Sequence, residues 1–461
     1  MAFHQAGLGQ RVLFVTLLAE SHGKLLQHLR AFSFFNDKYM PDRMRVLSGY
    51  EQLAKNGPAG LIDDLARALR ERQVRFMVID GFRILHEFVR ESPGEASLRL
   101  ATFIHDLNAL ATAARCTTLL LVPQAGYSAD SERTLVDGVI ELGGRATDMR
   151  WTRELIVHKL RAAAQLPGRH TFKITDDGIR VFPRLEALVA ARLRTPQELK
   201  GRVEFGIETL NAMIGGGLVE GSTTTVLGAA GAGKTLLGLN FLEAGTRRGE
   251  PAVYLGFFES PPRLLAKAAS VSGSLDKPYA EGLLRMLWQP PLELHNDELA
   301  EKLLETLAAS RARRLVIDGV AGFRHSAVYA GRVTRFVAAL TNELRAMGVT
   351  TLISEELSLL SDSAVVDSPQ LSAFVENIIL LRYLEVRSQL YRLISIMKLR
   401  DSDYDSAIRE FTITSRGIAV AANSESAETI LSGGGRTVNA GSPAPATPPG
   451  ARPARRTGRS G

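Results

Sequence analysis

Short continuous runs of hydrophobic residues recur along the chain and alternate with longer stretches of helical period. The runs include CTTLLLV at 116–122 and RRLVIDG at 313–319, and TRFVAALTNELRAM at 334–347 is one of the amphipathic stretches. Strands that are apolar throughout and lie between helices are typical of a parallel sheet covered on both faces. The pattern therefore predicts an α/β fold.

The same pattern occurs twice, about 239 residues apart. Glu20 and Glu259 each follow an apolar run, and Gly178 and Gly417 lie at the same place in the matching segments TFKITDDGI and EFTITSRGI. Three further pairs keep this interval to within one residue: Asp80 with Asp318, Lys159 with Lys398, and Arg161 with Arg400. Matches in one order at a constant, domain-sized interval predict a tandem duplication rather than a solenoid.

The duplication divides the chain into four parts. We expect a first copy at 1–183, a linker at 184–201, a second copy at 202–422 and a tail at 423–461. Ser, Gly, Ala, Pro and Arg dominate the tail, which has no apolar periodicity and is predicted to be disordered.

The composition shows where in the chain the excess positive charge lies. Of the 461 residues, 45% are hydrophobic and 23% are charged, as in ordinary folded proteins, and the formal net charge is +7. Five arginines and no acidic residue lie in 431–461, so most of the excess positive charge belongs to the tail. The rest is near neutral and shows no basic loop of the kind that binds DNA, so nucleic acid is not an expected partner.

The cysteine content bounds the chemistry further. Cys116 is the one cysteine, which excludes an intramolecular disulfide and a multi-cysteine metal site. We interpret it as a small buried hydrophobic residue in its strand. No segment approaches the ~18 uninterrupted apolar residues that span a membrane. A cytoplasmic protein without a membrane partner is therefore expected.

A phosphate-binding motif lies near the start of the second copy. It comprises Gly228, Ala229, Ala230, Gly231, Ala232, Gly233, Lys234 and Thr235, followed by Leu236. The pattern GxxxxGK[ST] stands between a β-branched strand and a helix, which is the context it requires. Small residues let backbone N–H groups surround a phosphate, while Lys234 would neutralise it and the Thr235 hydroxyl would bind Mg²⁺.

Two carboxylates complete the candidate site. Asp318 ends an apolar strand downstream of the motif, where an acidic residue positions the metal, although buried strands often end in Asp for other reasons. Glu259 ends the strand between these elements and could polarise the attacking water or hydroxyl. Its alternative role is to stabilise the N-terminus of the helix that begins in Ser-Pro-Pro.

These motifs resemble the KaiC family of RecA-like P-loop ATPases, the circadian clock ATPase/kinases and their relatives. The resemblance is carried by GIETLNAMIGGGLVEGSTTTVLGAAGAGKT, FFESPPRLL, RRLVIDG, GVTTLISEE, ENIILLRYLEV and ISIMKLRDSDYDSAIREFTITSRGI. It covers about residues 202–420, and residues 11–182 resemble a more diverged copy. It implies two tandem RecA-like P-loop NTPase domains, ATP and Mg²⁺ as cofactors, and a homo-oligomeric ring, usually a hexamer.

The resemblance also implies a role for Lys398 and Arg400. They match the family's Lys-x-Arg, which reaches the γ-phosphate of the neighbouring subunit. A cation at that point stabilises charge on the transferring phosphoryl group. Without this role, the two residues would be an ordinary exposed strand end.

Two departures from the family pattern concern chemistry. Clock-type members carry a Glu-Glu pair where this chain has Phe258 and Glu259, so Glu259 carries the base role alone or hydrolysis is slow. Their phosphorylated Ser-Thr pair corresponds here to Ser372 and Ala373. Ser372 is therefore the one candidate phosphorylation site of that pair, or a plain polar residue at a helix start.

A third departure is that the first copy has no phosphate motif, because the corresponding positions fall before Met1. Either Met1 is internal to a longer reading frame, or the first copy is a pseudo-ATPase domain. The retained Glu20, Asp80, Lys159 and Arg161 favour the longer reading frame. In both cases, we expect the first sheet to lack a central strand and its apolar faces to be less well covered than those of the second.

The sequence thus predicts an ATP-binding, Mg²⁺-dependent KaiC-like ATPase that acts in signalling or circadian-type regulation, with serine autokinase activity as a further expectation. One alternative is a nucleotide-gated oligomeric scaffold with negligible turnover. The other is a RecA-like ATPase acting on DNA, which the absence of basic loops disfavours.

Overall fold

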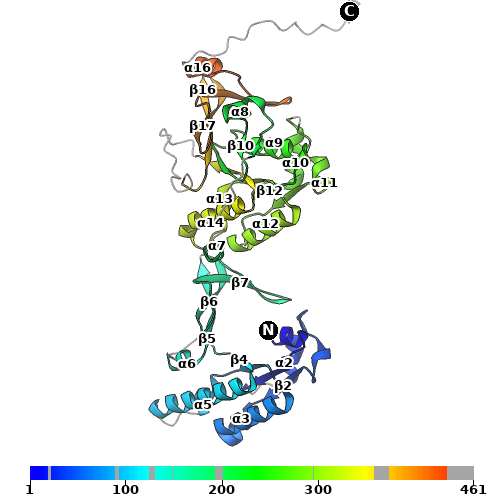
Figure 1. The fold of residues 1–461 in the computed structure, drawn as a ribbon, viewed down its shortest axis with the longest axis vertical. Helices are drawn as coiled ribbons and strands as arrows, with labels where there is room; N and C mark the ends of the chain where they lie inside the picture. The colour runs from blue at the N-terminus through cyan, green and yellow to red at the C-terminus, as the bar shows by residue number, and fades with distance from the viewer. Residues whose placement is uncertain are drawn as a thin grey trace, which may run out of the picture.

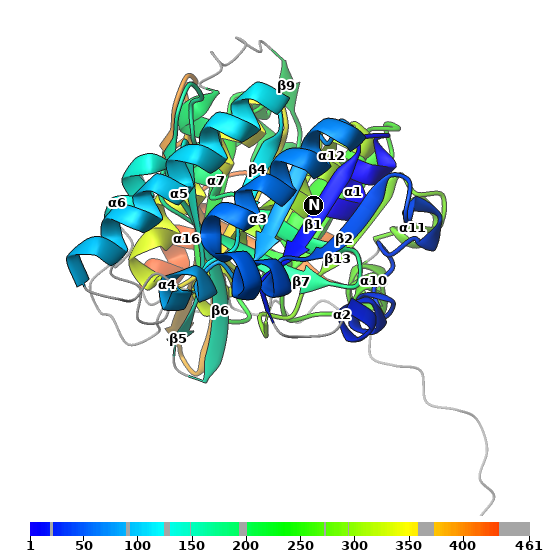
Figure 2. The same ribbon diagram turned by 90° about the horizontal axis from the view of Figure 1, so that it is seen from below.

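The computed structural model describes residues 1–18, 22–88, 93–123, 130–147, 149–192, 201–271, 273–293, 295–357 and 373–432. Figure 1 shows an elongated molecule in which the two copies are stacked end to end, and Figure 2 views the same ribbon along this stack. The expectations for Glu20, for Ser372, for most of the linker and for the tail beyond residue 432 lie outside the described residues. The start of the expected tail is folded, contrary to the prediction of disorder from residue 423: Glu425–Leu431 form a helix whose Ala427 and Ile430 are buried with Val386 and Leu393.

The second copy is built on one nine-stranded sheet in the order β13-β12-β14-β15-β11-β16-β17-β18-β19. Its first elements are β9 (Arg202–Val203), α8 (Glu208–Met213), β10 (Leu218–Val219), β11 (Thr223–Gly228), α9 (Lys234–Thr246), β12 (Ala252–Gly256), α10 (Pro261–Ala269), α11 (Asp276–Ala280) and β13 (Leu284–Trp288). The following elements are α12 (Asn296–Ser310), β14 (Arg314–Asp318), α13 (Val320–Ser326), α14 (Val333–Ala346), β15 (Thr350–Glu356), β16 (Asn377–Val386), β17 (Gln389–Leu399), β18 (Arg409–Thr414), β19 (Gly417–Val420) and α16 (Glu425–Leu431).

Five of these strands explain the continuous apolar runs of the sequence. β11 to β15 are mutually parallel and lie between two hydrophobic cores, one on each face. Along β12, Tyr254 packs into one core while Val253 and Leu255 pack into the other. Because both faces are covered, the middle positions of these strands are mostly apolar or small, while charged residues such as Arg314 and Asp318 lie at the strand ends. The predicted α/β fold is confirmed.

The first copy contains two separate four-stranded sheets, in the orders β2-β1-β3-β4 and β5-β6-β7-β8. Its helices are α1 (Ala2–Gly7), α2 (His22–Leu29), α3 (Tyr50–Arg72), α4 (Ile84–Phe88), α5 (Pro93–Ala114) and α6 (Asp130–Leu135), and helix α7 (Leu185–Ala191) follows the first copy in the chain. Its strands are β1 (Val12–Thr16), β2 (Met44–Ser48), β3 (Phe76–Asp80), β4 (Thr117–Leu120), β5 (Gly138–Thr147), β6 (Arg150–Leu160), β7 (Arg169–Thr175) and β8 (Gly178–Phe182).

The two copies have the same strand order apart from one strand. β1 pairs with β2 and β3 as β12 pairs with β13 and β14, and β5 pairs with β6 as β16 pairs with β17. Both long hairpins carry a β-bulge at the same place, between Val139 and Ile140 in the first copy and between Ile378 and Ile379 in the second. Among the described residues, the first copy has no counterpart of β11, the strand that joins the two halves in the second copy.

Helix α7 lies within the segment expected as a linker, and it packs on the second copy. Leu185 and Val189 belong to one of the cores of that copy. The Arg332 guanidinium binds Glu186 of α7 and Asp297 of α12, with N–O distances of 2.5 Å to each carboxylate. Figure 1 shows α7 between the β5–β8 sheet and helices α12 and α14.

Two smaller expectations can be compared with the structure. Cys116 is a buried free thiol, and burial raises the pKa of this thiol to about 11. In the described part of the chain, no helix has the length and apolar character needed to cross a membrane.

Candidate functional site

The phosphate motif forms a tight loop between β11 and α9. Gly228 ends β11, and a Cβ added there would lie 2.7 Å from the Leu381 carbonyl oxygen of β16. Gly233 has a φ of 108°, and a Cβ there would lie 2.7 Å from Ile413. Glycine is the residue that accepts both the close approach and the left-handed conformation. The sequence Gly-Ala-Ala-Gly-Ala-Gly thus lets the backbone turn closely around a phosphate-sized group.

The Lys234 side chain is folded back over this loop. Its Nζ donates hydrogen bonds to the carbonyl oxygens of Gly228 and Ala229, both at 2.7 Å. Burial lowers the pKa of Lys234, and the carboxylates of Glu356 and Asp318 act in the opposite direction. An ammonium held by two neutral carbonyls in a partly buried site is a strong partner for a phosphate oxygen.

Asp318 lies at the carboxyl end of β14 and receives three hydroxyl groups. Thr235 and Tyr254 donate to its Oδ2 at 2.9 and 2.6 Å, and Ser354 donates to its Oδ1 at 2.6 Å. The donors come from the start of α9 and from the neighbouring strands β12 and β15. The pKa of Tyr254 is raised, first by burial and then by the charge of Asp318.

The Thr235–Asp318 pair fits a magnesium ion in its donor chemistry. Mg²⁺ prefers oxygen ligands and usually keeps several waters and substrate phosphates instead of an all-protein cage. In the described part of the chain, no group of three or more His, Cys, Asp or Glu side chains could hold a metal. A hydroxyl and one carboxylate next to a phosphate loop are therefore suited to a metal that arrives with the nucleotide.

Glu259 lies three residues beyond β12, next to the N-terminus of α10. Its Oε1 accepts a hydrogen bond from Lys267 Nζ at 2.5 Å, and its Oε2 lies 3.9 Å from Arg263 Nε. Both cations are on α10. Glu259 Oε2 is buried and has no hydrogen-bond donor among the described residues. Sequence reasoning missed Lys267, which is the closest partner of the candidate base.

Phe258 occupies the place beside Asp318 where clock-type sequences carry the first glutamate. Its side chain is 60% exposed, and a Cβ at Gly319 would lie 3.3 Å from its ring. The position next to Asp318 is therefore apolar in this chain. Of these two positions, Glu259 is the one whose side chain has an acid–base group.

Lys398 and Arg400 lie toward the end of the strands that is opposite to the phosphate loop, near the level where β11 begins. β11 runs from Thr224, opposite Asn377, to Gly228, opposite Leu381, and Asn377 in turn pairs with Leu399. Lys398 pairs with Ile378, which lies opposite Thr225 of β11, so it is three residues, or ~10 Å along the strands, from the level of Gly228. Its Nζ donates to the Val375 carbonyl at 2.7 Å, and burial followed by the charge of Arg400 lowers its pKa.

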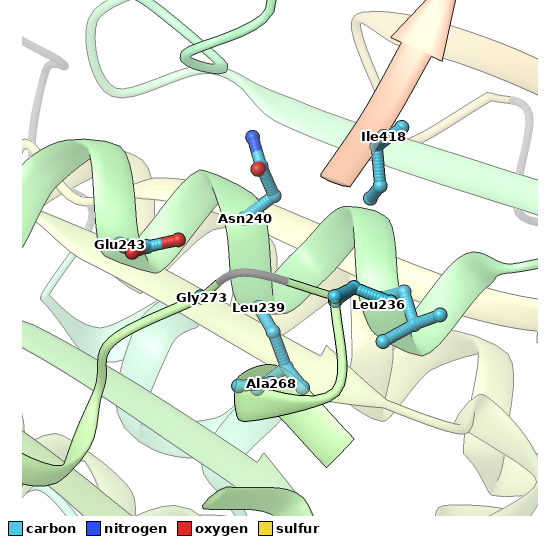
Figure 3. A pocket seen from close by; sticks show the side chains of 8 residues that line it. Leu236, Leu239, Asn240, Glu243, Ala268, Gly273 and Ile418 are labelled. Atoms are coloured by element: carbon cyan, nitrogen blue, oxygen red, sulfur yellow. The ribbon is translucent and has the colours of Figure 1, made fainter. Parts of the chain in front are cut away.

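The side chain of Leu236, the last residue of the predicted phosphate-binding segment, lines a small hollow along α9. Figure 3 shows the lining side chains, which are Leu236, Leu239, Asn240, Glu243, Ala268, Val271, Gly273 and Ile418. Glu243 is its one acidic group, and Oε1 of this residue accepts hydrogen bonds from Arg247 and from the Ser274 backbone, both at 2.7 Å. The hollow offers apolar contacts beside the first turn of α9 and no phosphate ligand.

Comparisons with known proteins agree with this geometry. The family model described as "ATPase: KaiC" matches residues 2–186 and 203–425. The chain is 28% identical over 396 residues to the circadian clock oscillator protein KaiC of Picosynechococcus sp., covering 85% of this chain and 74% of that protein. It is 27% identical to the KaiC of Parathermosynechococcus lividus over 398 residues, covering 85% and 71%. The KaiC of Rippkaea orientalis is 29% identical over 302 residues, covering 66% and 57%. The chain therefore belongs to the KaiC family of ATPases.

Proposed function

We propose that the second copy binds ATP with Mg²⁺ and hydrolyses it. The observation that carries this proposal is the meeting of Lys234, Thr235 and Asp318 at the carboxyl end of β11 and β14. In parallel sheets, ligands bind at this edge, and the N-terminus of the following helix adds N–H donors for a phosphate.

Each residue of the site has a distinct task in this proposal. Lys234 exchanges its two loop carbonyls for phosphate oxygens, and Thr235 and Asp318 hold the metal. Bound Mg²⁺ supplies positive charge that stabilises the transferring phosphoryl group. Glu259 orients the attacking water and accepts its proton through Oε2, the carboxylate oxygen without a hydrogen-bond donor among the described residues.

Lys398 and Arg400 require a second subunit in this proposal. Because they lie toward the end of the strands opposite to their own phosphate loop, they serve a nucleotide held by a neighbouring copy. A homo-oligomeric ring, hexameric as the family resemblance implies, provides that arrangement. We also propose a cytoplasmic signalling role of circadian type, and Ser372 as the acceptor of an autokinase activity.

A nucleotide-gated scaffold with negligible turnover is the second candidate function. The contact that favours it is the 2.5 Å ion pair between Glu259 and Lys267, because the ammonium holds one oxygen of the carboxylate and so restrains the side chain from turning toward a water. The apolar Phe258 beside Asp318 favours it too. In this case ATP would set ring assembly and would be released largely unhydrolysed.

Two measurements separate these possibilities. Lys234→Ala should abolish ATP binding, as measured by calorimetry, and an unchanged affinity would mean that the nucleotide site is elsewhere. Phosphate release should then fall by about 10²-fold or more in Glu259→Gln, if the carboxylate acts as a base. A wild-type rate no higher than that of Glu259→Gln, with ATP-dependent assembly intact, would establish the scaffold.

Lys267→Met sharpens the same test. Loss of the ammonium should raise phosphate release if the ion pair restrains Glu259, whereas Arg263→Met serves as the matched control because Arg263 lies 3.9 Å away and is largely exposed. Equal rates in the wild type and both variants would show that the ion pair does not restrain hydrolysis.

A further inference from the structure

Arginines stand at the edge of the first sheet where its parallel strands begin. Arg43 precedes β2, Arg11 precedes β1 and Arg75 precedes β3. Because β1 pairs with β2 and with β3 from the first residue of each strand, the three arginines lie at one level on adjacent strands. The Arg75 N–H also donates to the Arg11 carbonyl at 2.9 Å, so the pairing includes this level. The spacing between neighbouring arginines is therefore that of paired strands, ~4.8 Å.

Two further arginines extend this group. Arg115 lies two residues before β4, the next strand of the sheet, and Arg72 is the last residue of α3. Asp42 and Glu71 adjoin the group in the sequence, so cations outnumber acids there by five to two. Arg72 is half-buried and the other four arginines are exposed. We call the five residues the arginine row; they are Arg11, Arg43, Arg72, Arg75 and Arg115.

Two members of the arginine row cap helices. The Arg11 guanidinium donates to the carbonyl of Arg72, the last residue of α3, at 2.9 Å. The Arg75 guanidinium donates to the carbonyl of Ala114, the last residue of α5, also at 2.9 Å. Cations at a helix C-terminus are favourable, and this accounts for one hydrogen bond of each side chain. A guanidinium has several N–H donors and a permanent charge, so both side chains keep donors for an anion.

The other members of the row also contact uncharged groups. Arg72 donates to the Pro41 carbonyl at 3.3 Å, and the Arg43 guanidinium lies 6.0 Å from the centre of the Tyr39 ring. Within the part of the chain that the structure describes, no carboxylate forms an ion pair with any member of the arginine row, although other arginines of this copy have such partners. The row is thus held in place without being neutralised.

The corresponding edge of the second copy is mostly uncharged. The residues at the same level before β12, β13 and β14 are Pro251, Leu283 and Arg313. The Arg313 guanidinium is paired with the Glu220 carboxylate at 3.2 Å. Since the same strand order forms there with one neutralised arginine, the fold does not require an arginine row. The row is a property of the first copy.

We propose that the arginine row is a docking site for an acidic segment of a partner protein. Guanidinium groups bind carboxylates through paired hydrogen bonds. Side chains three or four residues apart on a helix are about 5–6 Å apart, which is close to the ~4.8 Å between strands. A helix with carboxylates on one face therefore fits the row. The site belongs to the first copy and does not depend on ATP hydrolysis by the second.

Charge and dimensions favour this occupant over two others. The tail of this chain carries arginines and no acidic residue in 431–461, so its charge has the same sign as that of the row. A nucleic acid fits less well, because four adjacent strands span only ~14 Å, whereas DNA-binding proteins usually contact about six to ten phosphates. Single strands are held by open aromatic rings, and the Tyr39 ring is already occupied by Arg43.

Fluorescence anisotropy with the full chain tests the proposal. The probe is a labelled, alanine-based helical peptide with glutamates at every third or fourth position, and the same peptide with glutamines is its control. The glutamate peptide should bind at low salt and weaken as salt rises. Combined Arg11→Gln and Arg75→Gln changes should weaken binding by about tenfold. The matched control combines Arg30→Gln with Arg67→Gln, two arginines outside the row that are each 63% exposed, and should bind like the wild type.

Arg115→Gln guards against a loss of folding in the double variant. Its side chain is exposed and makes no hydrogen bond or ion pair with the residues that the structure describes. The change should leave Tm unaltered and weaken peptide binding by about threefold.

Three results would overturn the proposal. The first is equal affinity for the glutamate and glutamine peptides, or equal effects of the row and control variants. The second is tighter binding of a single-stranded DNA oligonucleotide or an anionic lipid vesicle than of the glutamate peptide, which would assign the row to another class of partner. The third is self-association of the chain that the row variants abolish, because a second copy would then occupy the row.

Discussion

The two copies of this chain share a strand order, but the strands form one continuous sheet in the second copy and two separate sheets in the first. In the second copy, β11 lies at the centre and Ile379 and Leu381 are buried beneath the helices, whereas Ile140 and Leu142 of the first copy remain largely exposed. Register and bulge are nevertheless the same on both hairpins. The comparison teaches that strand register is set within each hairpin, and that the central strand adds burial and joins the halves.

The two sheets of the first copy are held by different kinds of contact, apolar packing for one and polar contacts with the second copy for the other. β1 to β4 surround a core formed with α3 and α5. The β5–β8 sheet is attached to the second copy by polar contacts, among them Lys173 with Glu298 at 2.6 Å and the Tyr329 hydroxyl donating to Glu154 at 2.6 Å. Contacts with the second copy thus help to hold the β5–β8 sheet in place, as a central strand would otherwise do.

The largest effect should come from placing a charge at the equivalent position of each copy. Ile379→Lys buries an unpaired ammonium next to β11 and should destabilise the second copy by about 3–5 kcal/mol, while Ile140→Lys should change stability by about 0.5 kcal/mol or less. Urea unfolding of both variants measures this difference. Equal losses would mean that the edge of β5 is covered in solution.

A smaller effect is expected from removing the cation between the copies. Arg332→Ala leaves Glu186 and Asp297 facing each other in a partly buried place and should cost about 2–4 kcal/mol. Because these contacts hold α7, the loss should appear as faster exchange in α7 and β8. Unchanged exchange there would show that the apolar contacts of Leu185 and Val189 suffice. Arg180→Ala, at the more exposed pair with Glu301, is the matched control.

Tyr254→Phe makes the second copy resemble the first, in which Phe14 occupies the corresponding place in register. The variant removes one hydroxyl from Asp318 and should lower stability by about 1.5–3 kcal/mol, because the lost hydrogen bond is to a charged acceptor. Thermal unfolding measures the change. No change in Tm would indicate that a water takes the place of the Tyr254 hydroxyl in the hydrogen bond to Asp318.

The smallest effect should be a weakening of the joint between the copies in acid. Burial pushes the pKa of Glu186 upward, but the hydrogen bonds and charge of Arg332 outweigh it, so that the pKa lies below its ordinary value. A carboxylate with a lowered pKa contributes stability above the pKa of the unfolded chain and loses it as the pH falls through the folded pKa. Unfolding should therefore become easier below about pH 4, and Glu186→Gln should remove this part of the pH dependence.

The sequence predicted the parts of the site that local spacing defines. The loop from Gly228 to Thr235 and the strand-ending Asp318 are contiguous motifs. The repeated interval predicted that the first copy lacks a counterpart of β11, as it does in the part of the chain that the structure describes. Tyr254, Ser354 and Lys267 could not be found in this way. Tyr254 and Ser354 meet Asp318 through the register of neighbouring strands, and Lys267 meets Glu259 through the turns of α10, and such contacts depend on tertiary packing.

The position of Lys398 and Arg400 has a geometric consequence for the proposed assembly. The phosphate loop and the two cations lie toward opposite ends of the strands. If the cations of one subunit act on the nucleotide of the next, two different faces meet at each contact, and the subunits join head to tail. Such heterologous contacts either close into a ring or continue as a filament. Each complete site then belongs to two chains, so that hydrolysis per subunit rises with protein concentration and a single chain in isolation carries half of each of two sites.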